Sequence, residues 1–435
     1  MTAIRFASIL VALAVVFAAT PLFAQEEAPP PADEPMAAEP AAEEEVAEEP
    51  AAEEEVAEEE VAEEEVAEEE ATEEEATEEE AAPAEEPSDL DRAIDRLSLS
   101  GIAVAVYQYA FMDDDYDDLG RGAFSVEPVI SYQLSEDGMF LMHFGFGAGN
   151  GLAAESPFTQ APWKGDVEDD FTDINGRNRD HFMRAWYRHS FALGESEDDG
   201  TVAVTGGITD STDYVDGNAY ANSELTQFMN STFVNSHAGF LPAYDLGVAV
   251  EADFDGWYVH FVGMEVGDNG QGRSFHYYGI EGGITIETDM GTGNYRLLLD
   301  TTTEDFLDPA GNDRESLMAI STSCDQQLSD VFGVWIRAGV QQDDAAIAYR
   351  SLLSGGVNIN GTLWDRETDE IGIGLARLGG GNLDYDVSHV LEVYGSTRID
   401  EHLLFTLDIQ YQSNGIDGAP NPKGWVLGAR FLIEF

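Results

Sequence analysis

The chain ends in Trp425-Val-Leu-Gly-Ala-Arg-Phe-Leu-Ile-Glu-Phe435, a stretch in which apolar side chains recur at every second position. One face would carry Trp425, Leu427, Ala429, Phe431, Ile433 and Phe435. The other face would carry Arg430 and Glu434 beside small or apolar residues. A period of two predicts a β-strand with one apolar face. In a soluble sandwich that face would point to a core, whereas in an outer-membrane barrel it would point to lipid and the charges to a wet lumen.

The same alternation recurs from Leu99 to the end of the chain and predicts an all-β protein. Alternation and turn residues together predict sixteen strands, an even number, as in bacterial barrels. They are expected at residues 98–112, 122–134, 139–149, 180–193, 201–209, 243–254, 257–267, 275–288, 293–303, 314–325, 331–342, 349–363, 369–378, 388–399, 403–413 and 423–435. A short helix is expected at 89–96, with Ser88 as its N-cap.

The predicted connections alternate in length. Short ones such as 135–138, 255–256 and 400–402 are interleaved with long ones such as 150–179 and 210–242. Short turns on the periplasmic side and long loops outside are typical of bacterial barrels. With sixteen strands, both ends of the barrel would lie on the short-turn side. The two longest loops are the candidates to fold inward.

The N-terminus predicts export. Arg5 precedes an apolar run from Ala7 to Ala19, and Pro21 and Ala24 follow, which is the pattern of a signal peptide over residues 1–24. No later stretch approaches the ~20 apolar residues that a membrane-spanning helix needs. A chain with this composition would therefore cross a membrane only as a closed barrel.

Residues 25–87 form an acidic, low-complexity segment with a five-residue repeat of the type Glu53-Glu-Glu-Val-Ala57. It holds 30 of the 87 acidic residues and no Lys or Arg. Self-repulsion and the lack of apolar surface predict an extended, unpacked spacer in the periplasm. A second reading, a tether that binds cations or a basic periplasmic partner, stays open.

The predicted barrel, residues 88–435, is also acidic, with 57 Asp and Glu against 18 Lys and Arg. Binding of nucleic acid is not expected, because phosphate contacts need clustered basic side chains. No Gly-x-Ser-x-Gly elbow or phosphate-binding loop indicates an enzyme. The acidic run from Asp113 to Asp118 lacks the spacing of an EF-hand and predicts a solvated loop. We therefore expect no catalytic residues, no metal site and no cofactor.

Several dispersed sequence blocks follow one another along the predicted barrel. Its first half contains His181-Phe-Met-Arg-Ala-Trp-Tyr-Arg-His189, Gly206-Gly-Ile-Thr-Asp210, Tyr214-Val-Asp-Gly-Asn-Ala-Tyr-Ala-Asn222 and Thr226-Gln-Phe228. Its second half contains Ser354-Gly-Gly356, Gly361-Thr-Leu-Trp-Asp-Arg366, Asp369-Glu-Ile-Gly-Ile-Gly374, Glu392-Val-Tyr394, Asp408-Ile-Gln-Tyr411 and Gly428-Ala-Arg-Phe-Leu-Ile-Glu-Phe435. In this order, the blocks resemble the carbohydrate-selective porins, the OprB-type family of outer-membrane porins. The resemblance covers nearly all of residues 98–435.

The resemblance implies a sixteen-stranded channel in the outer membrane, in contact with its lipid, that passes carbohydrates and other small polar solutes passively. The family often has Asn-Pro-Gly after the Asp-x-Gln-Tyr block. Here Asn414-Gly415 and Asn421-Pro-Lys423 stand instead, which puts sugar specificity in doubt. Porins of this size are often trimeric, so a homotrimer stays open. The alternative function is a structural anchor whose acidic arm holds a periplasmic partner.

A sixteen-stranded barrel leaves an aqueous lumen, so the function is expected from its inward-facing side chains. Planar charged groups bind sugar hydroxyls, and aromatic rings stack on sugar faces. The alternation assigns to the lumen Arg184, Trp186, Arg188, Glu251, Asp253, Glu281, Arg296, Trp335, Arg337, Glu392, Tyr394, Arg398, Asp408, Gln410 and Arg430. Arg184 and Arg188 are the strongest candidates for the narrow zone. The alternative is that these charges pair across strands and only keep the lumen hydrated, without binding a solute.

Overall fold

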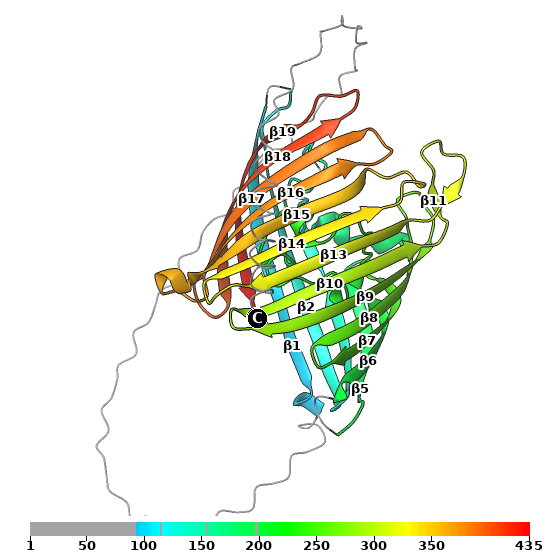
Figure 1. Ribbon diagram of the computed structural model, residues 1–435, viewed down its shortest axis with the longest axis vertical. Coiled ribbons are helices and arrows are strands. Elements are labelled where there is room, and N and C mark those ends of the chain that lie inside the picture. The colour runs from blue at the N-terminus through cyan, green and yellow to red at the C-terminus, as the bar shows by residue number, and fades with distance from the viewer. Residues whose placement is uncertain (1–92, 114, 154, 196–198) are drawn as a thin grey trace, which may run out of the picture.

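A computed structural model describes residues 93–435, apart from residues 114, 154 and 196–198 (Figure 1). The predicted signal peptide and acidic segment lie outside the described residues, as does the first half of the helix predicted at 89–96. Of that helix, Ala93 and Ile94 are helical, and the first strand begins at Leu97. No helix among the described residues is long and apolar enough to cross a membrane.

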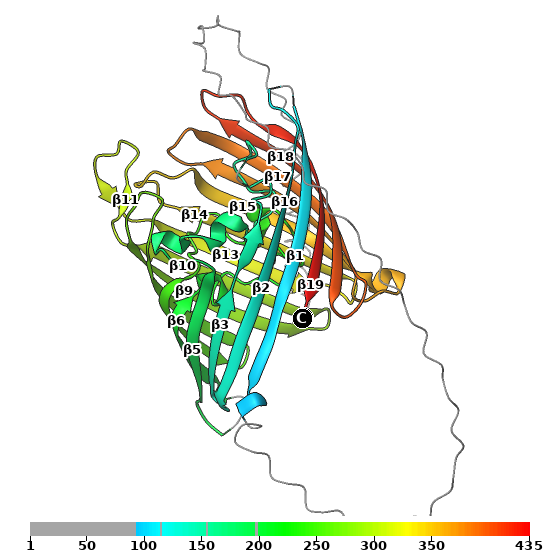
Figure 2. The same ribbon diagram turned by 180° about the vertical axis from the view of Figure 1, so that it is seen from behind.

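The described chain is a closed antiparallel β-barrel (Figures 1 and 2). Its seventeen-stranded sheet forms sixteen strands of wall, because β3 and β4 are two parts of one wall strand. The wall consists of β1 (Leu97–Met112), β2 (Leu119–Ser135), β3 (Gly138–Phe144), β4 (Phe146–Ala148), β5 (Phe182–Ala192), β6 (Thr201–Thr209), β7 (Asp245–Phe254), β8 (Trp257–Val266), β9 (Phe275–Thr288), β10 (Gly291–Thr302), β13 (Met318–Gln327), β14 (Phe332–Gln341), β15 (Tyr349–Asn360), β16 (Glu370–Gly380), β17 (Tyr385–Arg398), β18 (Leu403–Ile416) and β19 (Lys423–Glu434). A separate small hairpin consists of β11 (Phe306–Leu307) and β12 (Arg314–Glu315).

The barrel closes where its first and last strands meet. β1 pairs with β2 on one side and with β19 on the other, with Val106 opposite Arg430 in the closing pair. The sixteen predicted strands correspond to the sixteen wall strands. Several predicted boundaries differ from the observed ones by three or four residues. For example, the strand predicted at 314–325 is β13, which begins at Met318, and the strand predicted at 349–363 ends at Asn360, where Gly361–Trp364 forms a 3-10 turn.

The two faces of the wall have opposite character, as the alternation predicts. On β19, Trp425, Leu427, Phe431 and Ile433 are 45–47% exposed, whereas Arg430 is fully buried in the interior. The outer face is thus an apolar surface of large side chains. In water such a surface would be unfavourable, and it is the surface that lipid chains would cover.

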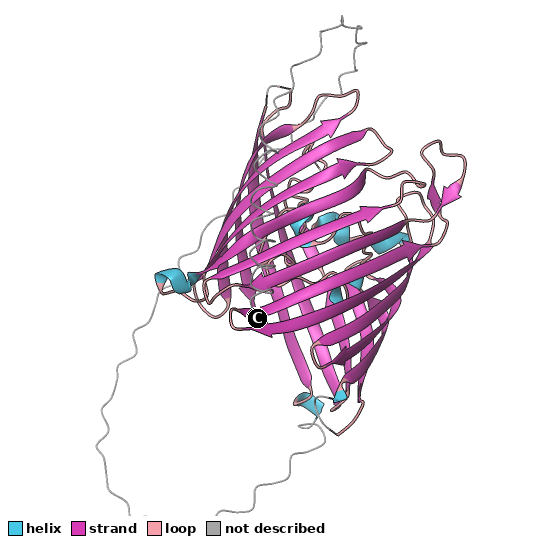
Figure 3. Cartoon of the chain, viewed as in Figure 1, coloured by secondary structure: helices cyan, strands magenta, loops and turns pink. Residues whose placement is uncertain are grey.

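Connections at one end of the barrel are short, and connections at the other end are long (Figure 3). Residues 136–137, 255–256 and 289–290 form short turns at the end where β1 begins and β19 ends. The two longest connections, residues 149–181 and 210–244, start from the opposite end.

Candidate functional site: a lumen narrowed by two loops

Two long loops fold into the barrel and determine the shape of its lumen. The first inward loop, residues 149–181, contains the 3-10 turns η1 (Glu168–Phe171) and η2 (Ile174–Gly176). The second inward loop, residues 210–244, contains η4 (Ser211–Asp213) and the helical turn α3 (Ser231–Val234). Figure 3 shows short helical turns inside the ring of strands. These are the two loops that were expected to fold inward, because they are the longest connections.

Aromatic packing holds the second inward loop against the wall. The Phe228 ring lies 5.5 Å from Trp335 and 4.9 Å from Tyr394, and the Phe233 ring lies 5.9 Å from Trp335, centroid to centroid. All four rings are at most 2% exposed. Burial of each large ring removes 150–250 Å² from water, so this cluster is a strong apolar anchor.

Charged side chains of the wall hold the same loop through its backbone. Glu392 accepts hydrogen bonds from the backbone N–H of Met229 at 2.5 Å and of Asn230 at 3.0 Å. Arg430 donates to the carbonyl oxygens of Glu224 at 2.5 Å and Gln227 at 3.2 Å. The irregular backbone of a loop has N–H and C=O groups that no strand or helix pairs. Burial of these groups without hydrogen-bond partners would cost free energy of folding. The wall charges supply those partners.

Asp216 connects the second inward loop to two further wall residues. Its carboxylate accepts from Arg337 Nε at 3.1 Å, and its own N–H donates to Glu281 at 2.7 Å. Glu281 also accepts from the Tyr258 hydroxyl at 2.7 Å. The side chains of Arg337 and Asp216 are 0% and 1% exposed. These charges form a closed network and offer no free group to water.

The first inward loop is tied to the wall and to the second loop. Gln410 and Gln108 both donate to the Pro162 carbonyl, at 2.7 and 2.9 Å. Lys164 N–H donates to the Met229 carbonyl at 2.9 Å. The Lys164 ammonium donates to the side chain of Asn235. The two loops therefore form one connected layer inside the barrel.

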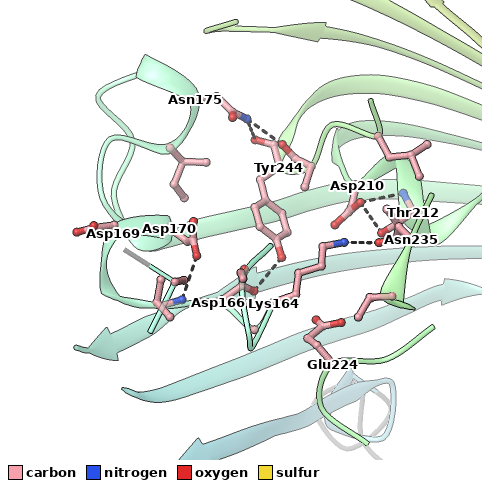
Figure 4. A pocket seen from close by; sticks show the side chains of 18 of the residues that line it. Lys164, Asp166, Asp169, Asp170, Asn175, Asp210, Thr212, Glu224, Asn235 and Tyr244 are labelled. Carbon is pink, nitrogen blue, oxygen red and sulfur yellow. Dashed lines mark hydrogen bonds between the residues drawn. The ribbon is translucent and has the colours of Figure 1, made fainter. Parts of the chain in front are cut away.

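A cavity of about 990 Å³ lies between the two loops and the wall (Figure 4). Carboxylates dominate its lining, with nine acidic side chains against two cationic ones, Lys164 and Arg184. The acidic residues are Glu127, Asp166, Asp169, Asp170, Asp173, Asp210, Asp213, Glu224 and Asp268. Figure 4 shows the Tyr244 ring between the two groups of carboxylates, with its hydroxyl directed at Asp166. The Tyr244 hydroxyl donates to Asp166 across 2.9 Å.

Burial and mutual repulsion change the protonation of the loop carboxylates. Burial first, then the charges of Glu127 and Asp170, raise the pKa of Asp166 well above its ordinary value. Burial, then Asp213, raises the pKa of Asp210 to about 6, although Thr212 donates to it. Burial also raises the pKa of Glu224, against the opposing effect of Lys164. Low local dielectric disfavours the ionised form of each group.

The structure separates Arg184 from Arg188. Arg184 lines the cavity and donates to both Asp213 oxygens, at 2.8 and 2.7 Å, while its Nε donates to His143 at 3.0 Å. Arg188 is paired with Glu251 and lies near the short-turn end, opposite Met139 in the sheet. Trp186, between them, has a buried indole N–H without a hydrogen-bond partner.

Most of the other predicted pore residues lie on the inner face of the wall but beneath the loops. Trp335 and Tyr394 are covered by the Phe228 and Phe233 cluster, which corrects the expectation that these two rings stack on a sugar. Glu281, Arg337, Glu392, Gln410 and Arg430 contact the loops, as described above. Asp408 is also buried and accepts from Gln410 at 2.8 Å.

The remaining three predicted residues form local pairs. Asp253 lies 2.9 Å from His260 Nε2, Arg296 pairs with Asp325 at 2.6 Å, and Arg398 pairs with Glu434 at 2.7 Å. Arg398 and Glu434 lie at the short-turn rim and are 28% and 41% exposed. The alternative of cross-strand pairing thus describes Arg296 and Arg398.

Alternation along the strands did not predict the cavity lining, because most of the lining residues belong to loops. Asp166, Asp170, Asp210, Glu224 and Tyr244 have no periodicity that assigns a face. The signal in the sequence was indirect: two long connections with several carboxylates between strands that are otherwise joined by short turns.

No family model matches the chain. An uncharacterized protein of Aquifex aeolicus is 27% identical over 282 residues, which is 65% of this chain and 77% of that protein. Among solved structures, OprB of Pseudomonas putida at high pH superposes with a TM-score of 0.63 at 15% identity, over 79% of this chain and 96% of that one. OmpF of Salmonella typhi, solved with daunomycin, gives a TM-score of 0.50 at 11% identity, over 78% and 97%. The chain has the sixteen-stranded porin fold, and its structural likeness to OprB agrees with the resemblance in its sequence.

Proposed function

We propose that this chain is an outer-membrane channel through which carbohydrates and other small polar solutes diffuse passively. The observation that carries the proposal is the combination of an apolar outer wall with a polar cavity of about 990 Å³ held open between two anchored loops. A sixteen-stranded barrel is wide enough for an aqueous path. No bound group and no turnover are needed for such a function.

The cavity chemistry suits polyhydroxylated solutes. Carboxylates accept hydrogen bonds from sugar hydroxyls, while Lys164 and Arg184 donate them. Each of these hydrogen bonds replaces a hydrogen bond to water with only a modest gain in binding free energy. A solute can therefore enter the cavity and also leave it. The excess of carboxylates favours cations over anions in the background conductance. Residues 25–87 would then extend into the periplasm, because β1 begins at the short-turn end.

The test is reconstitution of the mature protein in liposomes, with swelling rates measured for glucose and disaccharides against amino acids and polyols of similar size. Faster entry of sugars is expected. Entry graded by size alone would reduce the proposal to a general porin. Absence of any entry, with the barrel verified as folded by circular dichroism, would contradict the channel itself.

A further inference from the structure

Two carboxylates and one imidazole converge on the inner face of the β7–β8 hairpin, near its short turn. Glu251 and Asp253 are two residues apart on β7 and so share a face. His260 on β8 is paired with Glu251 across the sheet. One ligand atom from each of the three side chains lies within 4.8 Å of the other two.

The contacts of His260 leave its Nε2 directed at Asp253. Nδ1 lies 2.9 Å from the Tyr214 carbonyl oxygen, and Nε2 lies 2.9 Å from Asp253 Oδ1. A carbonyl oxygen only accepts, so Nδ1 carries the hydrogen. In a neutral ring Nε2 then directs a lone pair at a carboxylate oxygen, which is repulsive. The two atoms are thus held toward each other at hydrogen-bond distance, and a metal ion bound by both would replace the shared proton once the side chains move slightly apart.

The ring is held in the orientation that a metal ligand requires. Metal-binding histidines usually donate their other N–H to a carbonyl or carboxylate, which fixes both tautomer and ring plane. Here the Tyr214 carbonyl takes that role. The Tyr258 ring lies 4.3 Å from the His260 ring, centroid to centroid, and supports it from the side.

We propose that Glu251, Asp253 and His260 bind a divalent transition-metal ion such as Zn²⁺, with open coordination positions toward the lumen. An imidazole nitrogen favours Zn²⁺, Cu²⁺ or Ni²⁺ over Ca²⁺ and Mg²⁺, which take oxygen ligands. Ligand atoms of a tetrahedral Zn²⁺ site are about 3.4 Å apart, a spacing reached from the observed one by small side-chain rotations. The side chains of Glu251, Asp253 and His260 are 13%, 46% and 15% exposed, so an ion has access.

Arg188 sets the strength of this site. Its guanidinium pairs with Oε2 of Glu251, which leaves Oε1 for an ion but places a positive charge beside it. The like charge weakens metal binding and makes the ion exchangeable. Removal of that charge, in Arg188→Gln, is expected to tighten metal binding by about tenfold or more. This inference does not depend on which solute the channel passes.

The test uses the full-length mature protein, stripped with a chelator and titrated with Cu²⁺ while its electron paramagnetic resonance spectrum is recorded. The acidic segment contributes oxygen ligands in every variant, so the readout is the nitrogen splitting from one imidazole. That signal is expected in the parent protein and lost in His260→Asn. It should persist in His276→Asn, whose ring stacks with Tyr278 on the outer face of β9.

Because Cu²⁺ binds such a site more tightly than Zn²⁺, only a large excess of Zn²⁺ is expected to reduce the nitrogen-ligated Cu²⁺ signal. Asp253→Asn is expected to weaken Cu²⁺ binding at least about tenfold, as loss of a ligand does. Circular dichroism and the heat-dependent gel mobility of each variant establish that the barrel is intact. A nitrogen signal that survives in His260→Asn, or Cu²⁺ ligated by oxygen alone in the parent, would overturn the proposal. Asp253 and His260 would then be an imidazolium–carboxylate pair.

Discussion

Arg337 Nε donates to Asp216 Oδ1 across 3.1 Å, and both side chains are shielded from solvent. Arg337 belongs to β14 and Asp216 to the second inward loop, 121 positions earlier in the chain. Arg337 also donates to the carbonyls of Phe233 and Asp216, at 2.9 and 3.0 Å. One wall side chain thus fixes the loop at two places along its length, so the lumen depends on a buried ion pair.

Substitution of Arg337 by Met is expected to destabilise the protein strongly. It leaves the Asp216 carboxylate buried without its cation, and breaking a buried pair in this way costs about 3–5 kcal/mol. The measurement is the denaturant midpoint of the folded protein in detergent. A looser loop should also appear as larger fluctuations of the single-channel current.

The matched control is Arg398→Met, which removes the same side chain from the exposed pair with Glu434. Exposed pairs contribute about 0–1 kcal/mol, so only a small change is expected. Equal midpoints for Arg337→Met and Arg398→Met would show that the buried pair does not anchor the loop.

The charge of the cavity predicts a preference for cations that depends on pH. Burial and Asp213 raise the pKa of Asp210 to about 6, so this carboxylate is charged above pH 6 and neutral below it. Protonation removes negative charge from the cavity. The permeability ratio of K⁺ to Cl⁻, from reversal potentials in a KCl gradient, is therefore expected to fall as the pH is lowered from 8 to 5.

Asp210→Asn should remove the part of that pH dependence that lies near pH 6 and lower the K⁺ preference at pH 8. Asp343→Asn, at an exposed pair with Arg350 outside the cavity, serves as the control. Anion preference at both pH values in the parent protein would contradict the electrostatic role given to the cavity.

The strands were predictable because alternation is a local signal. Both Trp425 and Phe431 face outward, and Arg430 faces inward, as their spacing alone indicates. The loops that cover the inner face, in contrast, meet it through contacts between residues far apart in the sequence. Glu392 meets the backbone of Met229 and Asn230, more than 160 positions away, and no pattern in either segment predicts that contact. The inward side chains were therefore assigned to open water when several of them hold loops.

The arginines illustrate the same limit. Arg184 and Arg188 share one face of β5, and the sequence treats them alike. Their different surroundings come from other elements: Asp213 of the second inward loop for Arg184, and Glu251 of β7 for Arg188. Position along the strand, relative to the loops, decides which arginine meets the cavity.

This difference gives a prediction about the two arginines. Arg184→Gln removes a cation from the cavity and frees the Asp213 carboxylate, so both the K⁺ preference and the ratio of sugar to polyol entry should change. Arg188→Gln is expected to leave both quantities near those of the parent. Reconstituted channels measured side by side provide the comparison, and a larger effect of Arg188→Gln would place the narrow zone at the short-turn end instead.

The aromatic anchor predicts how the size limit of the channel is set. Phe228→Ala removes a ring that contacts Phe233, Trp335 and Tyr394, and such truncations cost about 3–5 kcal/mol. The second inward loop should then lie less tightly on the wall. Because the cavity is bounded by this loop, the ratio of disaccharide to monosaccharide entry is expected to rise in the swelling assay.

Phe431→Ala is the control for this size effect. Its ring is also aromatic and large, but it lies on the outer face of β19, is 47% exposed, and has its centroid 4.6 Å from that of the tilted Phe405 ring. Its loss removes apolar area without touching a loop, so the entry ratio should equal that of the parent. If Phe228→Ala lowers the unfolding midpoint but leaves the entry ratio unchanged, the loop is a structural plug whose anchoring does not set the passage, and the path for solutes must run elsewhere along the wall.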